Sequence, residues 1–272
     1  MRIKHRFAFG KNDTDIFALL SDHCIEYDRG DIISVVEITE DDKNYKTVAE
    51  IFQKHKIQPI SETIYSKQEI KEAEWLTIRS TWRNDYPQPE KDFGYMLSTY
   101  DSSDYCDQCG KGLVQKGCFS IKKKPKWGSR QFLMINWIHD ELFISGKAES
   151  VLKSNSVKGI DFYEVNNSSN KPIEGIKQIY VKTCLPPGMK KASVKNELVC
   201  RKCGVVKYMR KQGFIYYDKE VFNGISDDIV KSHEKFGEIT CASKIFITKK
   251  LHEVIINNHI DRGLVFEPIK LA

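Results

Sequence analysis

The sequence lacks a hydrophobic run long enough to cross a membrane. Its longest apolar stretch, FLMINWI at 132–138, is interrupted by Asn136, whereas a transmembrane helix needs about 20 mostly apolar residues. The first ten residues, MRIKHRFAFG, have charges spread among them and no apolar segment of the kind found in secretory signals. These two absences predict a cytoplasmic protein.

The sequence also lacks the common catalytic motifs. It contains no G-x-S-x-G, no phosphate-binding Walker loop and no H-E-x-x-H. In NWIHDELF (136–143), His139 precedes Asp140 and Glu141, but adjacent strand positions point to opposite faces, so these groups are not expected to converge. We therefore predict no catalytic residue and expect a protein that is not an enzyme.

The composition is that of a globular protein with a mild positive charge. Of the 272 residues, 40% are hydrophobic and 29% are charged, which is sufficient for a sizeable core. The length predicts two or three packed units. The net charge of +6 permits an acidic partner without requiring one.

The fold class expected is α+β, with an N-terminal α+β region at 1–92. Ser66 and Glu69 form a capping-box pattern, and Thr47 is the expected cap of another helix. The prolines of NDYPQPEKD (84–92) predict an extended linker. The apolar spacing predicts helices at 13–23, 47–56 and 66–75 and strands at 31–38 and 75–82.

An internal repeat follows this region. The segment 142–165 matches 245–269 with one inserted residue, and each reads as strand, helix and strand. Ser145 and Thr248 are the expected helix caps, and Gly159 and Gly263 are expected to stop the helices. Each copy is preceded by Cys-x-x-Cys-Gly, which predicts a first repeat at 93–169 and a second at 170–272.

The two Cys-x-x-Cys-Gly motifs have the pattern of zinc knuckles. In such a turn two thiolates point the same way, and the following glycine, here Gly110 and Gly204, can adopt positive φ and close the turn. Zinc takes four ligands in a tetrahedron, and one knuckle supplies two. We therefore predict one shared Zn²⁺ site with four ligands, Cys106, Cys109, Cys200 and Cys203.

Other interpretations of these cysteines stay open. Each pair could have its own site, completed by Cys118 or Cys184, or four thiolates could hold an iron–sulfur cluster. A redox Cys-x-x-Cys is disfavoured because neither motif opens a convincing helix. The unpaired cysteines are expected to be small buried hydrophobic groups: Cys24, Cys118, Cys184 and Cys241.

Two segments are candidate binding surfaces. The basic stretch IKKKPKWGSR (121–130) contains Lys122, Lys123, Lys124 and Trp127. Basic residues with aromatics can bind nucleic acid through phosphate contacts and stacking, so a zinc-ribbon nucleic-acid-binding protein is the alternative function. The second candidate is the acidic pair Asp140 and Glu141.

With both motifs in place, the chain resembles the bacterial double-CXXCG motif proteins. The stretches YPQPEKDFGYMLSTYDSSDYCDQCG (86–110) and INWIHDELFIS (135–145) are similar to that family as well. Its members include immunity proteins that neutralise a toxin delivered between neighbouring bacterial cells. The resemblance implies a cytoplasmic protein-binding module whose four knuckle cysteines bind zinc and whose partner is a cognate toxin. The net charge favours an acidic or neutral toxin over a basic nuclease.

Overall fold

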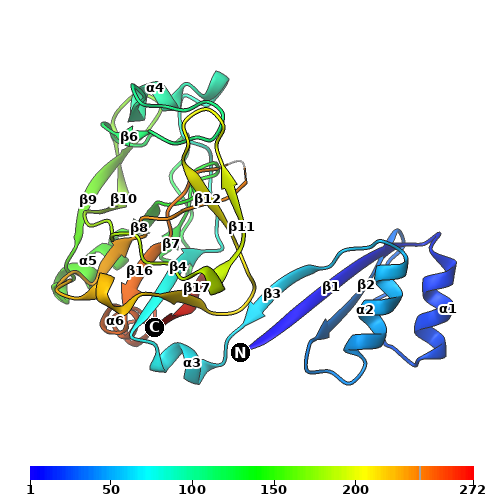
Figure 1. Cartoon of the computed structure of the whole chain (residues 1–272). Coiled ribbons are helices and arrows are strands. Elements are labelled where there is room, and N and C mark those ends of the chain that lie inside the picture. Colours follow the sequence, from blue (N-terminus) through cyan, green and yellow to red (C-terminus); the bar gives the residue numbers. More distant parts are fainter. Residues whose placement is uncertain (239) are drawn as a thin grey trace. The chain divides into compact units, whose positions relative to one another are not determined.

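The structure, a computed structural model, describes residues 1–238 and 240–272 and has a mixed α+β fold. The chain forms two compact units, Met1–Glu69 and Ile70–Ala272 (Figure 1). The boundary between them precedes the predicted linker at 84–92. Strand β4 (Trp75–Ser80) was predicted within the N-terminal region 1–92 but belongs to the second unit.

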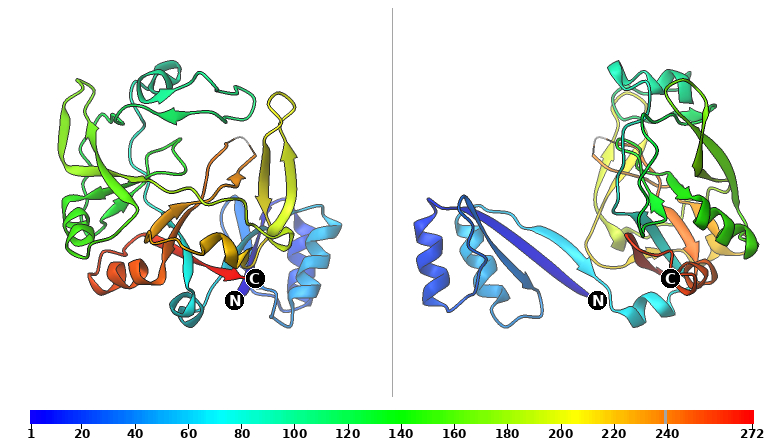
Figure 2. Two further views of the ribbon diagram at one scale, coloured as in Figure 1. Left: turned by 60° about the vertical axis from the view of Figure 1, so that its left-hand side comes forward. Right: turned by 180° about the vertical axis from the view of Figure 1, so that it is seen from behind.

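The first unit has two helices on one face of an antiparallel sheet in the order β2-β1-β3 (Figure 2). Alternate residues of the strands, including Phe7, Phe9 and Val36, join Ile16 and Phe52 of the helices in a buried cluster. The strand predicted at 31–38 corresponds to β2, whereas β1 and β3 were not predicted. The elements are β1 (Arg2–Gly10), α1 (Thr14–Asp22), β2 (Ile33–Thr39), α2 (Tyr45–Lys54) and β3 (Ile60–Ile64).

Two predicted helix caps have different outcomes. The capping box is confirmed before α3 (Lys67–Glu72): the Glu69 N–H donates to Ser66 Oγ at 3.1 Å, and the Ser66 N–H donates to Glu69 Oε2 at 2.8 Å. The predicted cap at Thr47 is wrong, because α2 begins at Tyr45 with Asn44 before it. The motif with two reciprocal hydrogen bonds was thus the more specific signal.

Most of the second unit is built on two sheets. Their orders are β7-β8-β10-β9 and β13-β17-β4-β16-β14. The strands are β7 (Phe132–Leu133), β8 (Leu142–Ser145), β9 (Ile160–Asn166), β10 (Pro172–Val181), β13 (Ile215–Tyr217), β14 (Ile229–Lys231), β16 (Ile245–Thr248) and β17 (Leu264–Leu271).

Shorter elements connect these sheets and form two hairpins. Strand β5 pairs with β6, and β12 pairs with β11 on one side and with β15 on the other. Their bounds are η1 (Lys91–Phe93), α4 (Tyr95–Thr99), β5 (Tyr100–Asp101), β6 (Val114–Gln115), η2 (Lys191–Ser193), β11 (Val194–Val199), β12 (Val206–Arg210), η3 (Lys219–Phe222) and β15 (Lys235–Phe236).

Both predicted strand–helix–strand segments are present. Helix α5 (Gly146–Ser154) lies between β8 and β9, and α6 (Lys249–Asn257) lies between β16 and β17. Their predicted caps are confirmed: Ser145 Oγ accepts from the Ala148 N–H and Thr248 Oγ1 accepts from the Leu251 N–H, each at 3.2 Å. In both helices the cap residue has an extended backbone conformation, and its hydroxyl oxygen accepts the hydrogen bond that begins the helix.

The predicted helix stops at Gly159 and Gly263 are wrong in position. The left-handed residue that follows each helix is Ser156, with φ 51°, or His259, with φ 52°. The glycines come later, at φ 88° and 84°, where the chain turns into β9 and β17. A Cβ at Gly159 would lie 2.7 Å from the Ile229 carbonyl oxygen, so this turn requires glycine for space as well as for φ.

Strand β10 in one sheet and strand β4 in the other pair with their neighbours in the same register. Phe162 of β9 faces Ile179 of β10, and Phe266 of β17 faces Ile78 of β4. At the next turn, the Lys182 N–H donates to Gly159 O at 3.0 Å and the Thr81 N–H donates to Gly263 O at 2.8 Å. In each sheet the central strand is antiparallel to both neighbours.

The origin of these central strands was not predicted. Strand β4 precedes the first cysteine motif in the chain, yet it lies between β16 and β17, which follow the second motif. Strand β10 falls within the predicted second repeat at 170–272, yet it lies between β8 and β9. The predicted boundaries at 92 and 169 therefore separate strands that pair in one sheet.

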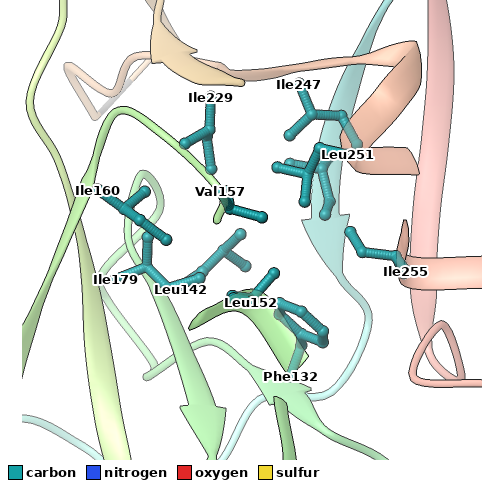
Figure 3. A pocket seen from close by; sticks show the side chains of 11 residues that line it. Phe132, Leu142, Leu152, Val157, Ile160, Ile179, Ile229, Ile247, Leu251 and Ile255 are labelled. Carbon is teal, nitrogen blue, oxygen red and sulfur yellow. The ribbon is translucent and has the colours of Figure 1, made fainter. Parts of the chain in front are cut away.

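The largest buried cluster joins both sheets with α5 and α6. A pocket in it is lined only by apolar side chains, among them Leu152 from α5 and Leu251 from α6 (Figure 3). A pocket without a polar group cannot orient a reaction. It therefore represents core packing between the two halves of the unit, and the candidate chemistry lies elsewhere.

Candidate metal centre

Each Cys-x-x-Cys motif forms the same tight turn between the two strands of a hairpin, β5 and β6 for the first motif and β11 and β12 for the second. In the first, the Cys106 N–H donates to Lys111 O and the Gly110 N–H donates to Cys106 O, both at 2.8 Å. In the second, the Cys200 N–H donates to Val205 O and the Gly204 N–H donates to Cys200 O, both at 2.9 Å. The matched hydrogen bonds give the two turns one geometry.

The glycine after each pair has the predicted conformation. Gly110 has φ 82° and Gly204 has φ 70°, which lies in the region that favours glycine over residues with a Cβ. No α-helix begins at either motif in the described residues. The arrangement that activates a thiol at a helix N-terminus is therefore absent from these turns.

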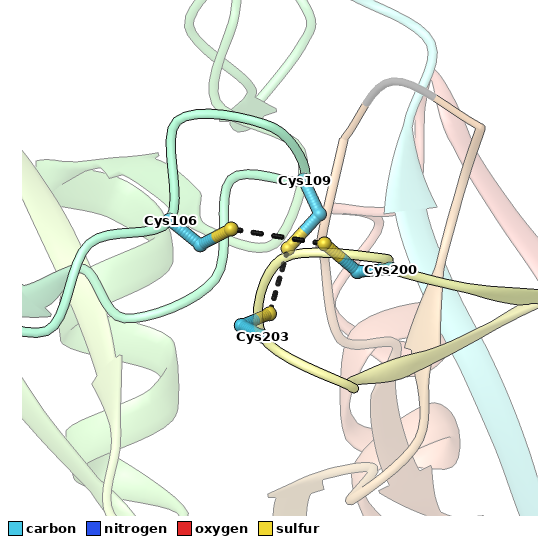
Figure 4. Close-up of side chains that lie close together, drawn as sticks. All are labelled: Cys106, Cys109, Cys200 and Cys203. Atoms are coloured by element: carbon cyan, nitrogen blue, oxygen red, sulfur yellow. Dashed lines mark hydrogen bonds between the residues drawn. The ribbon is translucent and has the colours of Figure 1, made fainter.

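The fold brings the two turns together (Figure 4). Cys106 Sγ lies 3.7 Å from Cys200 Sγ, and Cys109 Sγ lies 3.5 Å from Cys203 Sγ. All four sulfur atoms lie within 4.8 Å of one another. The sulfurs thus form one compact group, with each short distance joining a residue of one turn to a residue of the other.

These distances fit a single tetrahedral metal ion. With metal–sulfur bonds of about 2.3 Å, the sulfur–sulfur edge of a tetrahedron is roughly 3.8 Å. The observed distances of 3.5 and 3.7 Å are close to that edge and much longer than a disulfide bond of about 2.05 Å. The four-cysteine cluster is compatible with one shared metal site.

The surroundings of the thiols differ. Burial raises the pKa of the Cys109 thiol to about 12. The pKa of the Cys200 thiol is lowered to about 6, mainly because its sulfur accepts a hydrogen bond from the Cys203 backbone N–H. Backbone N–H groups therefore favour a thiolate at Cys200, whereas the buried Cys109 needs a nearby positive charge to ionise, which a bound cation would supply.

Polar side chains also connect the two turns. Lys202 Nζ lies 2.8 Å from Asp107 Oδ1, so an ion pair joins the middle of one motif to the middle of the other. Because both side chains are more than half exposed, this pair contributes little to stability. The sulfur cluster is the stronger candidate for what joins the turns.

The other cysteines stay outside the cluster. In the described parts of the chain, no group of three or more metal-binding side chains includes Cys118 or Cys184, so the interpretation with two separate sites has no support. Cys24 and Cys184 are exposed, in contrast to the buried positions expected for them. Cys241 is half-buried, and its Cβ lies 3.8 Å from the position of a Cβ on Gly110, close to the cluster without joining it.

The basic candidate surface is only partly exposed. Lys122, Lys123 and Lys124 are exposed, and Lys122 forms an ion pair with Glu90. Trp127 is half-buried: its indole N–H donates to Gly175 O at 3.1 Å, and its ring packs edge-on against Trp82. The stretch therefore has cations on the surface, but its aromatic ring is engaged in packing, which weakens the prediction of nucleic-acid stacking.

The acidic candidate surface requires a correction. Glu141 is 7% exposed, and its carboxylate pairs with Lys231 and accepts a hydrogen bond from Gln178 Nε2 at 3.1 Å. Burial raises the pKa of this carboxyl, and Lys231 opposes that effect. Asp140 is half-buried and accepts from the Ser243 N–H at 3.3 Å. Glu141 is thus an interior group and not a surface for a partner.

A group of exposed aromatic residues was not predicted. Tyr86, Phe93 and Trp137 lie together on the surface although 44 residues separate Phe93 from Trp137. The sequence offered only a weak signal, which is the set of aromatics near Pro87 and Pro89 in a segment interpreted as a linker.

No family model matches the chain, and no curated protein matches it. The resemblance to double-CXXCG motif proteins stays a prediction. Among the described residues, none of the helices has the length and apolar character needed to cross a membrane.

Proposed function

We propose that the four-cysteine cluster binds one Zn²⁺ ion that joins the two hairpins. The support is the donor set: four thiolates at tetrahedral spacing fill the coordination sphere of zinc. The compact sulfur group encloses one ion, whereas an iron–sulfur cluster needs a larger cage. With all four positions taken by protein, zinc has no site for water or substrate and has a structural role.

The second unit, in this proposal, arose by duplication with exchange of one strand. One copy runs from β4 through the first motif to β9, and the other runs from β10 through the second motif to β17. Each copy contributes its first strand to the sheet of the other, and the matched registers around Ile78 and Ile179 support this relation. The metal would then join equivalent turns of the two copies.

The function that best fits this scaffold is protein binding without turnover, as an immunity protein that neutralises a bacterial toxin by covering it. The observation that carries the proposal is the four-cysteine cluster. A zinc ion held by all four sulfurs would have no open coordination position, so its role would be to organise a surface. The resemblance to double-CXXCG motif proteins supplies the class of partner.

The metal is tested by elemental analysis of the purified chain. We expect about one zinc per chain for the native protein and for Cys241→Ser, because Cys241 lies beside the cluster and outside it. We expect loss of zinc from Cys106→Ser and from Cys200→Ser. Zinc at two per chain, or iron with a visible absorption band, would reject the shared zinc site.

Immunity is tested in cells by co-expressing the chain with each protein encoded by the neighbouring genes that inhibits growth when expressed alone. We expect co-expression of the full chain to restore growth, and we expect the two purified proteins to form a complex of fixed stoichiometry. Growth inhibition that persists with soluble, zinc-loaded protein present would reject the immunity proposal.

A further inference from the structure

We infer that Tyr86, Phe93 and Trp137 form a preformed docking surface for a protein partner, here named the aromatic patch. This inference rests on the proposed protein-binding function and adds the location and the chemistry of the contact. Tyr86 and Trp137 are each 37% exposed and Phe93 is 54% exposed. Aromatic side chains, especially Trp and Tyr, are the residues most often found at the energetic centre of protein interfaces.

The three rings form one contiguous group around Trp137. The centroid of Tyr86 lies 4.7 Å from that of Trp137, and the centroid of Phe93 lies 4.9 Å from it. Buried Tyr95 lies beside Trp137 at 6.0 Å. Such contacts hold large apolar side chains at the surface, where each keeps a substantial exposed area.

The backbone beneath the aromatic patch is unusual. Asp85, Asp92, Phe93 and Trp137 all have positive φ, between 53° and 67°. For bulky residues such as Phe93 and Trp137 this conformation is rare and is held only where the surrounding structure enforces it. Phe93 and Trp137 thus have strained backbone conformations and exposed side chains, so they contribute little to packing of the core.

Asp85 supplies part of that enforcement. Its Oδ2 accepts hydrogen bonds from the Lys122 N–H at 2.8 Å and the Lys123 N–H at 3.0 Å. Its carbonyl oxygen accepts from Asn136 Nδ2 at 2.8 Å, one residue before Trp137. The loops that carry Tyr86 and Trp137 are therefore tied together, and a preorganised surface loses little conformational entropy on binding.

Charges at the rim define the chemistry of the partner. Lys122 is paired with Glu90. In the described part of the chain, five charged residues near the rings have no ion-pair partner: Arg83, Asp85, Lys91, Asp92 and Lys123. Three of these five are positive, so the rim has a small positive excess. The complementary surface is an apolar side chain surrounded by carboxylates on a protein.

Nucleic acid fits this surface less well. Base stacking needs an open ring face, whereas Tyr86 and Phe93 pack on Trp137 at 60° and 51° and Tyr95 lies nearly parallel to it. Phosphate recognition needs a stripe of cations, whereas Arg83, Lys91 and Lys123 are few and have Asp92 among them. The aromatic patch therefore favours a protein partner.

The test uses a phage-displayed library of random peptides selected against the full zinc-loaded chain. We expect selected peptides to combine a large apolar residue with Asp or Glu. We expect the double variant Tyr86→Ser/Phe93→Ser to weaken their binding about thirtyfold or more, which corresponds to the loss of at least about 2 kcal/mol at interface centres. Zinc content and thermal midpoint should stay near native values.

The matched control is Ile256→Ser, which removes an equally exposed apolar side chain from α6 and should leave peptide binding unchanged. Selected peptides that bind the double variant as well as the native chain would overturn the inference. So would a single-stranded oligonucleotide whose binding depends on Tyr86 and Phe93. If the double variant still protects cells from the toxin, the aromatic patch is refuted while the immunity proposal stands.

Discussion

Removal of the proposed zinc ion should destabilise the second unit and leave the stability of the first unit unchanged. Zinc would link Cys109 to Cys200 and so close a loop of roughly 90 residues, and the chain-entropy model for a cross-link over such a loop gives about 4.6 kcal/mol of stabilisation. Most of this arises because the unfolded chain loses freedom. We therefore expect chelation, or Cys200→Ser, to lower the free energy of unfolding by about 4–5 kcal/mol.

The chain offers a clean assay for this effect. Its four tryptophans, at positions 75, 82, 127 and 137, all lie in the second unit. Tryptophan fluorescence therefore reports that unit alone, while circular dichroism reports both. With a urea slope of about 3 kcal/mol/M, the expected loss moves the fluorescence midpoint down by about 1.5 M. No equivalent shift is expected for the first unit, which has none of the four ligands.

The matched control for the cysteine substitution is Cys241→Ser. This residue lies beside the first turn and outside the sulfur cluster, so its loss should leave the midpoint close to that of the native chain. The reasoning would be refuted if chelation left the fluorescence midpoint unchanged, or if Cys241→Ser lowered it as much as Cys200→Ser did.

Three further perturbations test the local structure. Burial lowers the pKa of His252 below its ordinary value of 6.5, so the unfolded chain binds more protons at this residue than the folded chain. The free energy of unfolding should therefore fall as the pH drops below about 6.5. Thermal midpoints measured against pH should show a smaller fall for His252→Gln than for the native chain. Ser145→Ala and Thr248→Ala should each cost about 1 kcal/mol in urea unfolding through loss of a helix cap, and equal native stability would contradict this. Gly159→Ala should destabilise the second unit, since the added Cβ would lie 2.7 Å from Ile229 O. The control Gly146→Ala places a Cβ in open space at the start of α5 and should be neutral or stabilising. The reverse order of unfolding midpoints would show that the turn at Gly159 is not constrained as described.

Local patterns predicted local structure well. The Ser66–Glu69 capping box, the hydroxyl caps at Ser145 and Thr248 and the positive φ of Gly110 are all present. Each depends on residues within a few positions of one another, so a short window of sequence contains the whole interaction. Thr47 and Gly159 show the limit: a single suitable residue, without a reciprocal partner, marked the wrong position.

Long-range contacts could not be predicted in the same way. Glu141 was interpreted as a surface residue, but it is buried because Lys231, 90 residues away, comes to its carboxylate. The aromatic patch likewise joins residues from two separate loops. A sequence window contains neither partner, so hydrophilic character alone suggested exposure for Glu141.

By itself, the sequence determined the mixed α+β class, the two strand–helix–strand segments and the four candidate ligands, because residue type, spacing and caps act over short distances. Only the tertiary structure decided that these four cysteines meet in one group, since their convergence requires two turns about ninety residues apart to lie side by side. It also decided that β4 lies at the centre of a sheet whose other strands all follow the second cysteine motif in the chain. Such pairing depends on burial and register across the whole unit, which no local pattern specifies.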